Sequence, residues 1–455
     1  MKFDSRSIWE CERLNSIGRY KYAGLYVRCY YFLTPVGKGM AWSCTMESTY
    51  RIFNLFNSNI DKKSELFQDC VLKEASFIAA NIERHSNNNH ILFNYIGLVL
   101  ADEMFELYDH YYHSHLYDEI SKQFNGDGTN FEASTAYHLL SLEAILMLVN
   151  FVPRLKSKLF SLFNVEDAIA FVHHVKCDSG IFVVGDNDGS NCFDFSQKQK
   201  NGFSHNKKLI QIENIERLSD SLSVKHYFTK FYNDFGLFSV KRNNYHFILS
   251  NTNHGQNGKA GHNHNDCCSI FLEVGGYDFV VDPGVFLYSI KRNSQRSIQN
   301  HSSPYFLSEN GEAIQPEAFT SSFRLTNNSK REMQYNSSTV KSSYGFVSQS
   351  KDFEIVREVS YDSDNLTIHD YAKTTDTNVR VGLTLCLAPG VDCYIDKSRI
   401  HLWKNGISVS IHFLDDCYSK IEKSFHFYEY GKWTSTRKVS VIFKGKELKW
   451  KIVIN

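Results

Sequence analysis

Apolar positions up to about residue 175 recur every three to four residues. In SELFQDCVLKEASFIAANIERH they form one stripe, made of Leu66, Phe67, Cys70, Val71, Phe77, Ile78 and Ile82. That spacing places the side chains on one face of an α-helix. The segment ASTAYHLLSLEAILMLVNFV is apolar nearly all round, which is typical of a helix buried among other helices. The pattern therefore predicts an all-α N-terminal part.

From about Asp234 the pattern changes to short segments in which apolar and polar residues alternate, such as FGLFSVKR, CSIFLEV, NLTIHDYAK and ISVSIHF. Gly, Asn, Asp and Pro separate these segments, as expected for an antiparallel sandwich of many strands. The fold class predicted is α+β in two domains. A helical domain covers 1–224, with 176–224 as a transition segment, and a β-sandwich domain covers 225–455.

Composition and charge exclude some classes of binding partner and indicate the cellular compartment. The chain has 455 residues with 50 Lys+Arg and 50 Asp+Glu, so no overall basic field favours nucleic acid. The charged N-terminus is not a secretory signal, and no run of about 18 apolar residues predicts a membrane span. The 11 irregularly spaced cysteines are typical of a reducing compartment. We expect a cytoplasmic protein, and the sequence does not indicate its oligomeric state.

The segment HSNNNHILFNYIGL carries more polar side chains than one helix start needs. Asn87, Asn88, Asn89 and His90 precede an apolar helical run, and one of the asparagines is expected to cap it. The others are either ordinary surface residues or a hydrogen-bonding cluster that holds an anion at the positive end of the helix. Both interpretations stay open on the residues alone.

A second polar feature is Tyr137 in GDGTNFEASTAYHLL, within an otherwise apolar helix. Such a tyrosine usually packs its ring inside while its hydroxyl reaches the rim of the core. A tyrosine near cationic or donating groups can instead act as a catalytic acid or base.

The third feature is the segment GHNHNDCCSIFLEVGGYDFVVDPG. If it is extended, His262 and His264 face the same side, an arrangement that often presents two imidazoles to one metal ion such as Zn²⁺. A hairpin turn at Gly275-Gly276 would place Asp282 beside Ser269, five residues beyond His264. At about 3.3 Å per residue that gap is too long for one ligand sphere. Either the entry segment bends back, or the residues belong to different sites.

Four segments in this order resemble the heparinase II/III family of polysaccharide lyases and the related alginate lyases. They are FIAANIERHSNNNHILFNYIGL, DGTNFEASTAYH, VVGDNDGS and the glycine-histidine segment above. The resemblance implies an incomplete α/α toroid followed by an antiparallel β-sandwich, with a cleft between the two domains. It also implies β-elimination at a uronic acid of an acidic polysaccharide, such as a glycosaminoglycan or an alginate-like polymer.

Residue roles follow from the same resemblance. Asn89 and His90 match the positions that neutralise the uronate carboxylate, Tyr137 matches the acid and base, and His262 matches a catalytic histidine of the sandwich. Tyr288, in DPGVFLY, matches a second tyrosine of the cleft. The resemblance further implies a structural Zn²⁺ held by His264, Asp282 and His301. No other cofactor is expected.

Two alternatives remain. A non-catalytic glycan-binding or polysaccharide-assembly protein would keep the fold without the reaction. The letters HNHND also fit the metal motif of a metallo-hydrolase, although Cys267 and a predicted strand follow where that class needs a further histidine. Without a visible export signal, an enzyme of this type would act on an intracellular or biosynthetic polysaccharide, or its substrate would differ from heparin.

Overall fold

The computed structural model describes residues 5–15, 17–192, 207–220, 222, 228–288 and 291–454. The chain forms two compact units, each made of several segments. The helical unit comprises Met1–Gly128, Leu139–Ile169 and Ser190–Ser223, and the strand unit comprises Thr129–His138, Ala170–Gly189 and Val224–Asn455. The predicted domain boundary at 224/225 lies outside the described residues. The segment that contains Tyr137 groups with the strands, although the sequence pattern assigned it to the helical domain.

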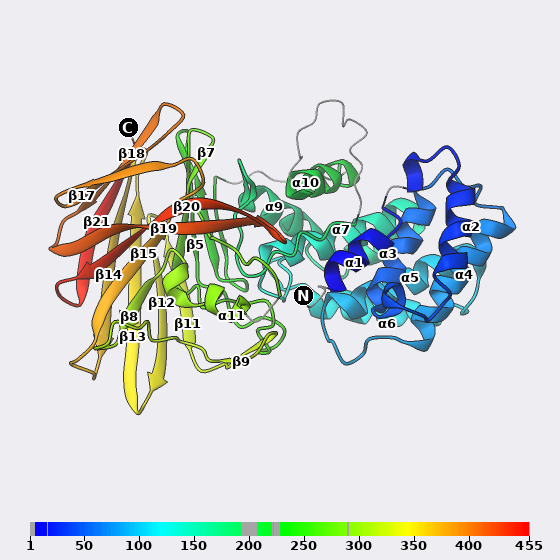
Figure 1. The fold of residues 1–455 in the computed structure, drawn as a ribbon, viewed down its shortest axis with the longest axis horizontal. Coiled ribbons are helices and arrows are strands. Elements are labelled where there is room, and N and C mark those ends of the chain that lie inside the picture. Colours follow the sequence, from blue (N-terminus) through cyan, green and yellow to red (C-terminus); the bar gives the residue numbers. More distant parts are fainter. Residues whose placement is uncertain are drawn as a thin grey trace. The chain divides into compact units, whose positions relative to one another are not determined.

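Helices make up the N-terminal part of the chain, as the apolar spacing predicts (Figure 1). They are α1 Ser5–Glu12, α2 Ala23–Leu33, α3 Thr45–Phe56, α4 Glu65–Ala80, α5 Asn89–Phe105, α6 Tyr111–Gln123, α7 Thr135–Phe151, α8 Lys156–Phe160, α9 Val165–Val175 and α10 Lys207–Leu218. Short 3₁₀ turns lie at η1 Ile17–Arg19, η2 Met40–Trp42 and η3 Pro153–Leu155.

Polar caps fix where two of these helices begin. The Ser64 hydroxyl accepts a hydrogen bond from the Phe67 backbone N–H at 3.2 Å and caps α4. In the asparagine-rich segment, Asn88 is the cap of α5, and its Oδ1 accepts from the backbone N–H of His90 at 3.1 Å. Capping satisfies an amide that has no partner within the helix. Asn88 is therefore the asparagine that supplies the predicted cap.

Antiparallel strands make up the strand unit, so the predicted fold class is confirmed. One sheet has eight strands in the order β11-β12-β13-β14-β21-β18-β17-β16, one has four in the order β19-β20-β15-β8, and one has five in the order β3-β4-β5-β6-β7. The short pairs β1-β2 and β10-β9 complete the set, and a small helix, α11 Arg292–Gln295, and η4 Ile298–Asn300 lie between β7 and β8.

The strands have the following bounds: β1 Lys176–Cys177, β2 Gly180–Ile181, β3 Thr229–Tyr232, β4 Leu237–Lys241, β5 Tyr245–Ser250, β6 Ser269–Val274, β7 Tyr277–Val280, β8 Pro304–Leu307, β9 Phe319–Ser321, β10 Arg324–Leu325, β11 Lys330–Asn336, β12 Thr339–Ser348, β13 Lys351–Tyr361, β14 Asn365–Thr374, β15 Arg380–Cys386, β16 Asp392–Asp396, β17 Arg399–Lys404, β18 Ile407–Phe413, β19 Cys417–Glu429, β20 Lys432–Phe443 and β21 Glu447–Ile454.

One apolar core joins the three large sheets. It combines Phe247 and Leu249 from β5 with Leu383 and Leu385 from β15 and with Trp450 from β21, all of them buried. Strands such as β14 bury every second residue, which matches the alternation seen in the sequence. Inward-facing side chains of facing sheets therefore build a sandwich core.

Each unit also buries an arginine–carboxylate pair. In the helical unit Arg51 Nε donates to Glu74 Oε1 at 2.7 Å, and both side chains are fully buried. In the strand unit Arg357 Nε donates to Asp370 Oδ1 at 2.6 Å, while the Trp450 indole N–H donates to Asp370 Oδ2 at 2.9 Å. A buried pair of this kind fixes the register of the segments it joins, because leaving either charge unpaired costs several kcal/mol.

The hairpin turn predicted at Gly275-Gly276 is confirmed, since Val274 pairs with Tyr277 across it. Both glycines have positive φ, as a two-residue hairpin turn requires. Gly236 also has positive φ, but a Cβ there would lie 2.4 Å from the backbone oxygen of Asn251, whereas a Cβ at Gly276 would meet nothing within 4 Å.

This contrast gives a stability prediction. Both Gly236→Ala and Gly276→Ala place alanine at positive φ, which costs about 1 kcal/mol or more. Gly236→Ala must also displace backbone, and we expect it to lower the free energy of unfolding by about 1–3 kcal/mol more than the control. Urea-induced unfolding of the two variants measures the difference. Equal losses would show that the close contact to Asn251 contributes nothing.

Within the described ranges, no single helix is long and apolar enough to cross a bilayer. One bent pair, Thr135–Phe151 with Pro153–Phe160, meets the criteria by length and composition only.

Candidate active site and metal-ligand cluster

Three of the predicted catalytic side chains lie together in the strand unit. The rings of Tyr137 and His262 stack with centroids 3.8 Å apart and an interplanar angle of 22°. The hydroxyls of Tyr137 and Tyr288 lie 3.0 Å apart, within hydrogen-bonding distance. The structure thus joins Tyr137 to residues 125 and 151 positions further along the chain.

The first turn of α7 holds Tyr137 in place. Ser134 Oγ accepts from the Tyr137 backbone N–H at 3.3 Å and donates to the backbone oxygen of Asp186 at 2.7 Å. The Thr135 backbone N–H and hydroxyl bond to Val184 O and Phe182 O at 3.2 and 3.0 Å. The start of the helix is therefore tied to the segment 182–186, which leads into the Gly-Asp-Asn-Asp turn at 185–188.

Asp186 in that turn is the centre of a fully buried network. Its Oδ2 lies 2.9 Å from His262 Nδ1, its Oδ1 lies 3.1 Å from His264 Nε2, and it pairs with Arg292 of α11. Burial opposes the ionised carboxylate, but Arg292 and the two histidines outweigh it and hold the pKa of Asp186 well below its usual range. One carboxylate therefore orients both histidines of the GHNHND segment.

Both ring nitrogens of His262 contact carboxylates. Nδ1 faces Asp186, and Nε2 lies 3.2 Å from Glu132 Oε2. Burial lowers the pKa of this imidazole, but the bonds to the two carboxylates exceed that effect and raise it above the ordinary value. The two carboxylates favour the protonated form of His262, which the electron-rich face of the stacked Tyr137 ring also stabilises.

The two tyrosines keep their protons at neutral pH. Burial raises the pKa of Tyr137 well above its usual value, and the nearby Asp188 adds to the effect. Burial also raises the pKa of Tyr288, and Asp186 adds to it, while Arg292 opposes it. A phenol of this kind is equipped to donate a proton to an atom on which negative charge develops.

The predicted metal ligands form a second buried cluster in the strand unit. One ligand atom each of His264, Asp282 and His301 lies within 4.8 Å of the others, and all three side chains are buried. His301 Nδ1 lies 2.6 Å from Asp282 Oδ2. The spacing argument from the sequence is also resolved, because the chain between His264 and β6 bends. Cys268 has φ 55°, and the backbone N–H of Ser269 bonds back to Asp266 O at 3.2 Å.

Two buried nitrogens in this cluster are unsatisfied. Among the described residues, neither His264 Nδ1 nor His301 Nε2 has a hydrogen-bond partner. The other nitrogen of His264 bonds to the Asp186 carboxylate, which is how metal-binding histidines are usually oriented. Burial lowers the pKa of His264, so its imidazole is neutral and can bind a cation. The donor set of two imidazoles and one carboxylate fits Zn²⁺.

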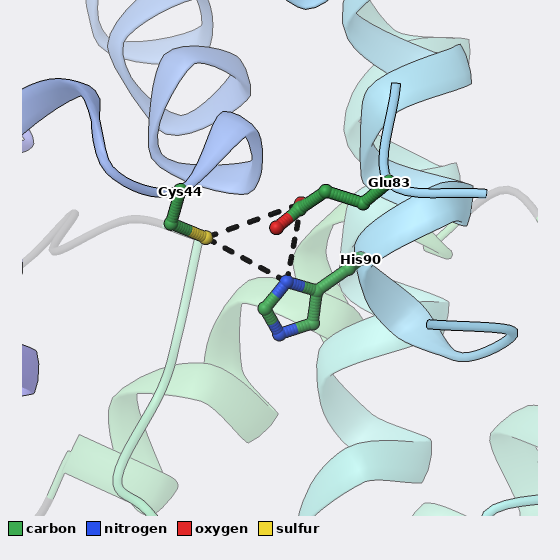
Figure 2. Close-up of side chains that lie close together, drawn as sticks. All are labelled: Cys44, Glu83 and His90. Atoms are coloured by element: carbon green, nitrogen blue, oxygen red, sulfur yellow. Dashed lines mark hydrogen bonds and ion pairs between the residues drawn. The ribbon is translucent and has the colours of Figure 1, made fainter. Parts of the chain in front are cut away.

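Asn89 and His90 lie in the helical unit, at the start of α5. His90 Nδ1 is 3.2 Å from Glu83 Oε2 and 3.6 Å from Cys44 Sγ (Figure 2). Burial lowers the pKa of His90, but Cys44 and Glu83 outweigh it and raise it well above the ordinary value. Burial opposes ionisation of Glu83 as well, yet its bond to His90 lowers its pKa to about 2. Asn89 is almost fully buried.

In the structure, the two histidines of the HNHND segment belong to two different clusters. His262 joins the tyrosines, His264 joins Asp282 and His301, and Asp266 belongs to no ligand cluster among the described residues. A single HxHxD metal centre is therefore not formed, and the metallo-hydrolase alternative is not favoured. Asp186, Glu132 and Arg292 were not predicted from the sequence. The turn GDNDG was a usable signal for Asp186, since a carboxylate that becomes buried needs a charged or hydrogen-bonding partner.

Two family models match the sequence. The model described as "Heparinase II/III-like, C-terminal" covers residues 228–454, and that described as "Heparinase II/III N-terminus" covers residues 38–159. No curated protein sequence matches the chain.

Solved structures share the fold at low identity. The heparan sulfate lyase HepC from Pedobacter heparinus is 17% identical with a TM-score of 0.66, over 100% of this chain and 77% of that one. A heparinase III is 13% identical with a TM-score of 0.69, over 99% and 76%. A chondroitinase AC lyase is 9% identical with a TM-score of 0.51, over 95% and 70%. These matches confirm the predicted combination of helical toroid and β-sandwich.

Proposed function

Because the chain belongs to the heparinase II/III-like family, we propose that it is a polysaccharide lyase that cleaves a uronic-acid-containing polymer by β-elimination. The observation that carries the proposal is the stacked and hydrogen-bonded set of Tyr137, His262 and Tyr288. A set of buried titratable groups with shifted pKa values is typical of catalytic sites.

The reaction explains why these residue types are needed. β-Elimination removes the C5 proton of the uronate, forms a C4–C5 double bond and expels the O4 leaving group. The adjacent carboxylate must be neutralised so that negative charge can develop on it in the transition state. The oxygen that leaves must receive a proton.

We assign proton donation to Tyr137. Its raised pKa keeps the phenol protonated until an oxygen that gains charge comes within reach. Tyr288 holds the hydroxyl through the 3.0 Å contact, and the His262 cation stabilises the phenolate that remains. His262 can accept the C5 proton only as a neutral ring whose Nε2 has given its proton to Glu132 and has left that carboxylate.

Asn89 and His90 are proposed to neutralise the uronate carboxylate. The raised pKa of His90 keeps a positive charge on its ring at neutral pH, and about a third of its side chain is exposed, at 31%. A partly exposed cation at a helix start suits an anionic ligand. The predicted cleft that would bring this pair to Tyr137 remains a prediction.

The balanced charge of the chain supports a uronate polymer with little sulfate. Lys+Arg and Asp+Glu are both 50, so the chain has no net positive charge to attract a densely sulfated polymer.

A screen of uronate polymers tests the proposal. Purified protein is incubated with alginate, hyaluronan, heparosan, chondroitin and heparan sulfate, and the ultraviolet absorbance of the new C4–C5 double bond is followed. We expect absorbance to grow with at least one polymer. Binding of a polymer without any increase in absorbance would instead support the glycan-binding alternative.

We further propose that His264, Asp282 and His301 hold a structural Zn²⁺. When bound, the ion would tie the segment before β6 to the loops that follow β7 and η4. The two unsatisfied imidazole nitrogens support this, since a buried nitrogen without a partner is costly.

Metal analysis checks this second proposal. We expect His264→Ala to bind one zinc ion fewer per chain than the native protein and to melt at a lower temperature. His254→Ala is the matched control, because His254 lies in the same segment but bonds to Glu317 at 2.7 Å. Loss of the same zinc in both variants, or in neither, would contradict the assignment.

A further inference from the structure

Cys44, Glu83 and His90 come together from three separate segments of the helical unit. Cys44 is the N-cap residue of α3, Glu83 lies in the loop after α4, and His90 lies in the first turn of α5. Cys44 Sγ is 3.6 Å from His90 Nδ1 and 4.0 Å from Glu83 Oε2, and His90 Nδ1 is 3.2 Å from that same Oε2. The three atoms therefore surround a common point, as Figure 2 shows.

This geometry differs from that of a catalytic relay. In a cysteine–histidine–carboxylate relay the thiol and the carboxylate contact opposite nitrogens of the ring, so that a proton can pass along it. Here both contact Nδ1, and the second ring nitrogen points away from them (Figure 2). Convergence on one point is instead the arrangement that a metal ion requires.

The distances between the three ligand atoms match those expected around one Zn²⁺ ion. Tetrahedral Zn²⁺, with bonds of about 2.3 Å to sulfur and about 2.0–2.1 Å to nitrogen and oxygen, separates S and N by about 3.5 Å, S and O by about 3.5 Å, and N and O by about 3.3 Å. The observed separations are 3.6, 4.0 and 3.2 Å. Only the sulfur–oxygen pair must close by a few tenths of an ångström, which a small rotation of Glu83 supplies.

The surroundings hold the ligands in place. Asn94 Oδ1, on α5, accepts from the Glu83 backbone N–H at 2.9 Å and from the Thr45 hydroxyl at 3.0 Å. One buried amide thus links the segments that carry all three ligands, as partners outside the coordination sphere do in metal sites. Cys44 is 5% exposed, whereas the side chain of His90 is 31% exposed, so one side of the cluster is open.

We propose that Cys44, Glu83 and His90 bind one Zn²⁺ ion and leave its fourth position open to solvent or to a carboxylate. One thiolate and one carboxylate balance the charge of the ion. In the metal-free protein His90 Nδ1 shares its proton with Glu83, and the ion displaces that proton when it binds. Nε2 keeps its own proton, so His90 remains a hydrogen-bond donor with its ring fixed. The consequence for catalysis rests on the proposed function, because His90 is the assigned neutralising residue, but the metal site itself does not.

Cobalt titration tests the site without any polysaccharide. Four-coordinate Co²⁺ has strong visible bands, and a thiolate ligand adds a charge-transfer band in the near ultraviolet. Metal-free full-length protein titrated with Co²⁺ is expected to develop the thiolate band fully within two equivalents, because the His264 cluster can take the other ion, and Zn²⁺ is expected to remove the band. Cobalt at the His264 cluster adds no thiolate band, since that ligand set contains only nitrogen and oxygen.

Three variants decide the outcome. Cys44→Ser is expected to abolish the thiolate band, whereas Cys29→Ser, at an exposed cysteine of the same unit, is expected to keep it. Glu83→Gln keeps the sulfur and is expected to show the band with at least about tenfold weaker affinity, the size of effect that even outer-shell partners have. Absence of the band in the native protein, or its persistence in folded Cys44→Ser, would overturn the proposal. The polymer screen then judges the lyase function separately.

Discussion

Replacing Tyr137 by phenylalanine is expected to lower kcat/KM for β-elimination by about 10²–10⁴-fold, the contribution of one positioned acid or base. The variant loses only the hydroxyl, so its ring still stacks on His262 at the same place. Initial rates on the polymer found in the screen measure the effect. Because the lost contact to Tyr288 is one neutral hydrogen bond, the free energy of unfolding should fall by only about 1 kcal/mol.

Tyr288→Phe is the matched control for that experiment. It removes the other hydroxyl of the same pair and leaves the proton of Tyr137 in place. We expect a clearly smaller loss of rate than in Tyr137→Phe, together with a similar small change in stability. If Tyr137→Phe keeps its rate within about twofold while Tyr288→Phe loses it, the assigned roles are reversed. If both variants keep their rates, proton transfer by either phenol is excluded.

Asp186→Asn is expected to lower the free energy of unfolding of the strand unit by about 3–5 kcal/mol, because it leaves Arg292 buried without its counter-charge. Asp186 and Arg292 are both fully buried, and no other carboxylate among the described residues pairs with Arg292. Urea-induced unfolding at neutral pH measures the loss. The same variant should also lower the rate of elimination, since it removes the charge that orients His262.

The free energy of unfolding that Asp186→Asn loses should depend on pH. The folded-state pKa of Asp186 is depressed, so its stabilisation is complete above the unfolded value of about 3.9 and is lost as the pH falls through the folded value. The difference between native protein and Asp186→Asn should therefore shrink on acidification. A difference that stays constant to low pH would contradict the ionised state assigned to Asp186.

Asp278→Asn is the control for burial alone. Asp278 on β7 is 1% exposed, but among the described residues no arginine pairs with it, and burial raises its pKa. A neutral amide can replace it, so we expect a change within about 1 kcal/mol. The double variant Asp186→Asn with Arg292→Met should recover part of the stability, because it removes both charges together.

The fold was predictable because its signals are local. The apolar stripe in 64–85 and the alternation in strands such as 365–374 follow from the helical and strand periods. The Gly275-Gly276 turn follows from the need for positive φ. What the sequence did not reveal is that the first turn of α7 groups with the strands, since bonds from Ser134 and Thr135 to 182–186 decide it.

The candidate site was predictable in its residues but not in its connections. Tyr137, His262 and Tyr288 do meet, and so do His264, Asp282 and His301. The bend that brings His264 to Asp282 depends on Cys268 at φ 55°, a conformation that no cysteine signals in advance. The shared role of Asp186 depends on contacts 76 and 78 positions away in the sequence.

Side chains from outside the glycine-histidine segment also hold its backbone in place. Arg296 donates to Asn263 O at 2.6 Å from Nη2 and at 3.0 Å from Nε, and Arg292 donates to Gly261 O at 3.0 Å. For protein engineering, the short sequence GHNHND alone is therefore not enough to transfer the site to another protein. Grafted onto another sandwich, it would carry its histidines but not their geometry, unless Arg292 of α11 and Arg296, directly after that helix, were transferred with it.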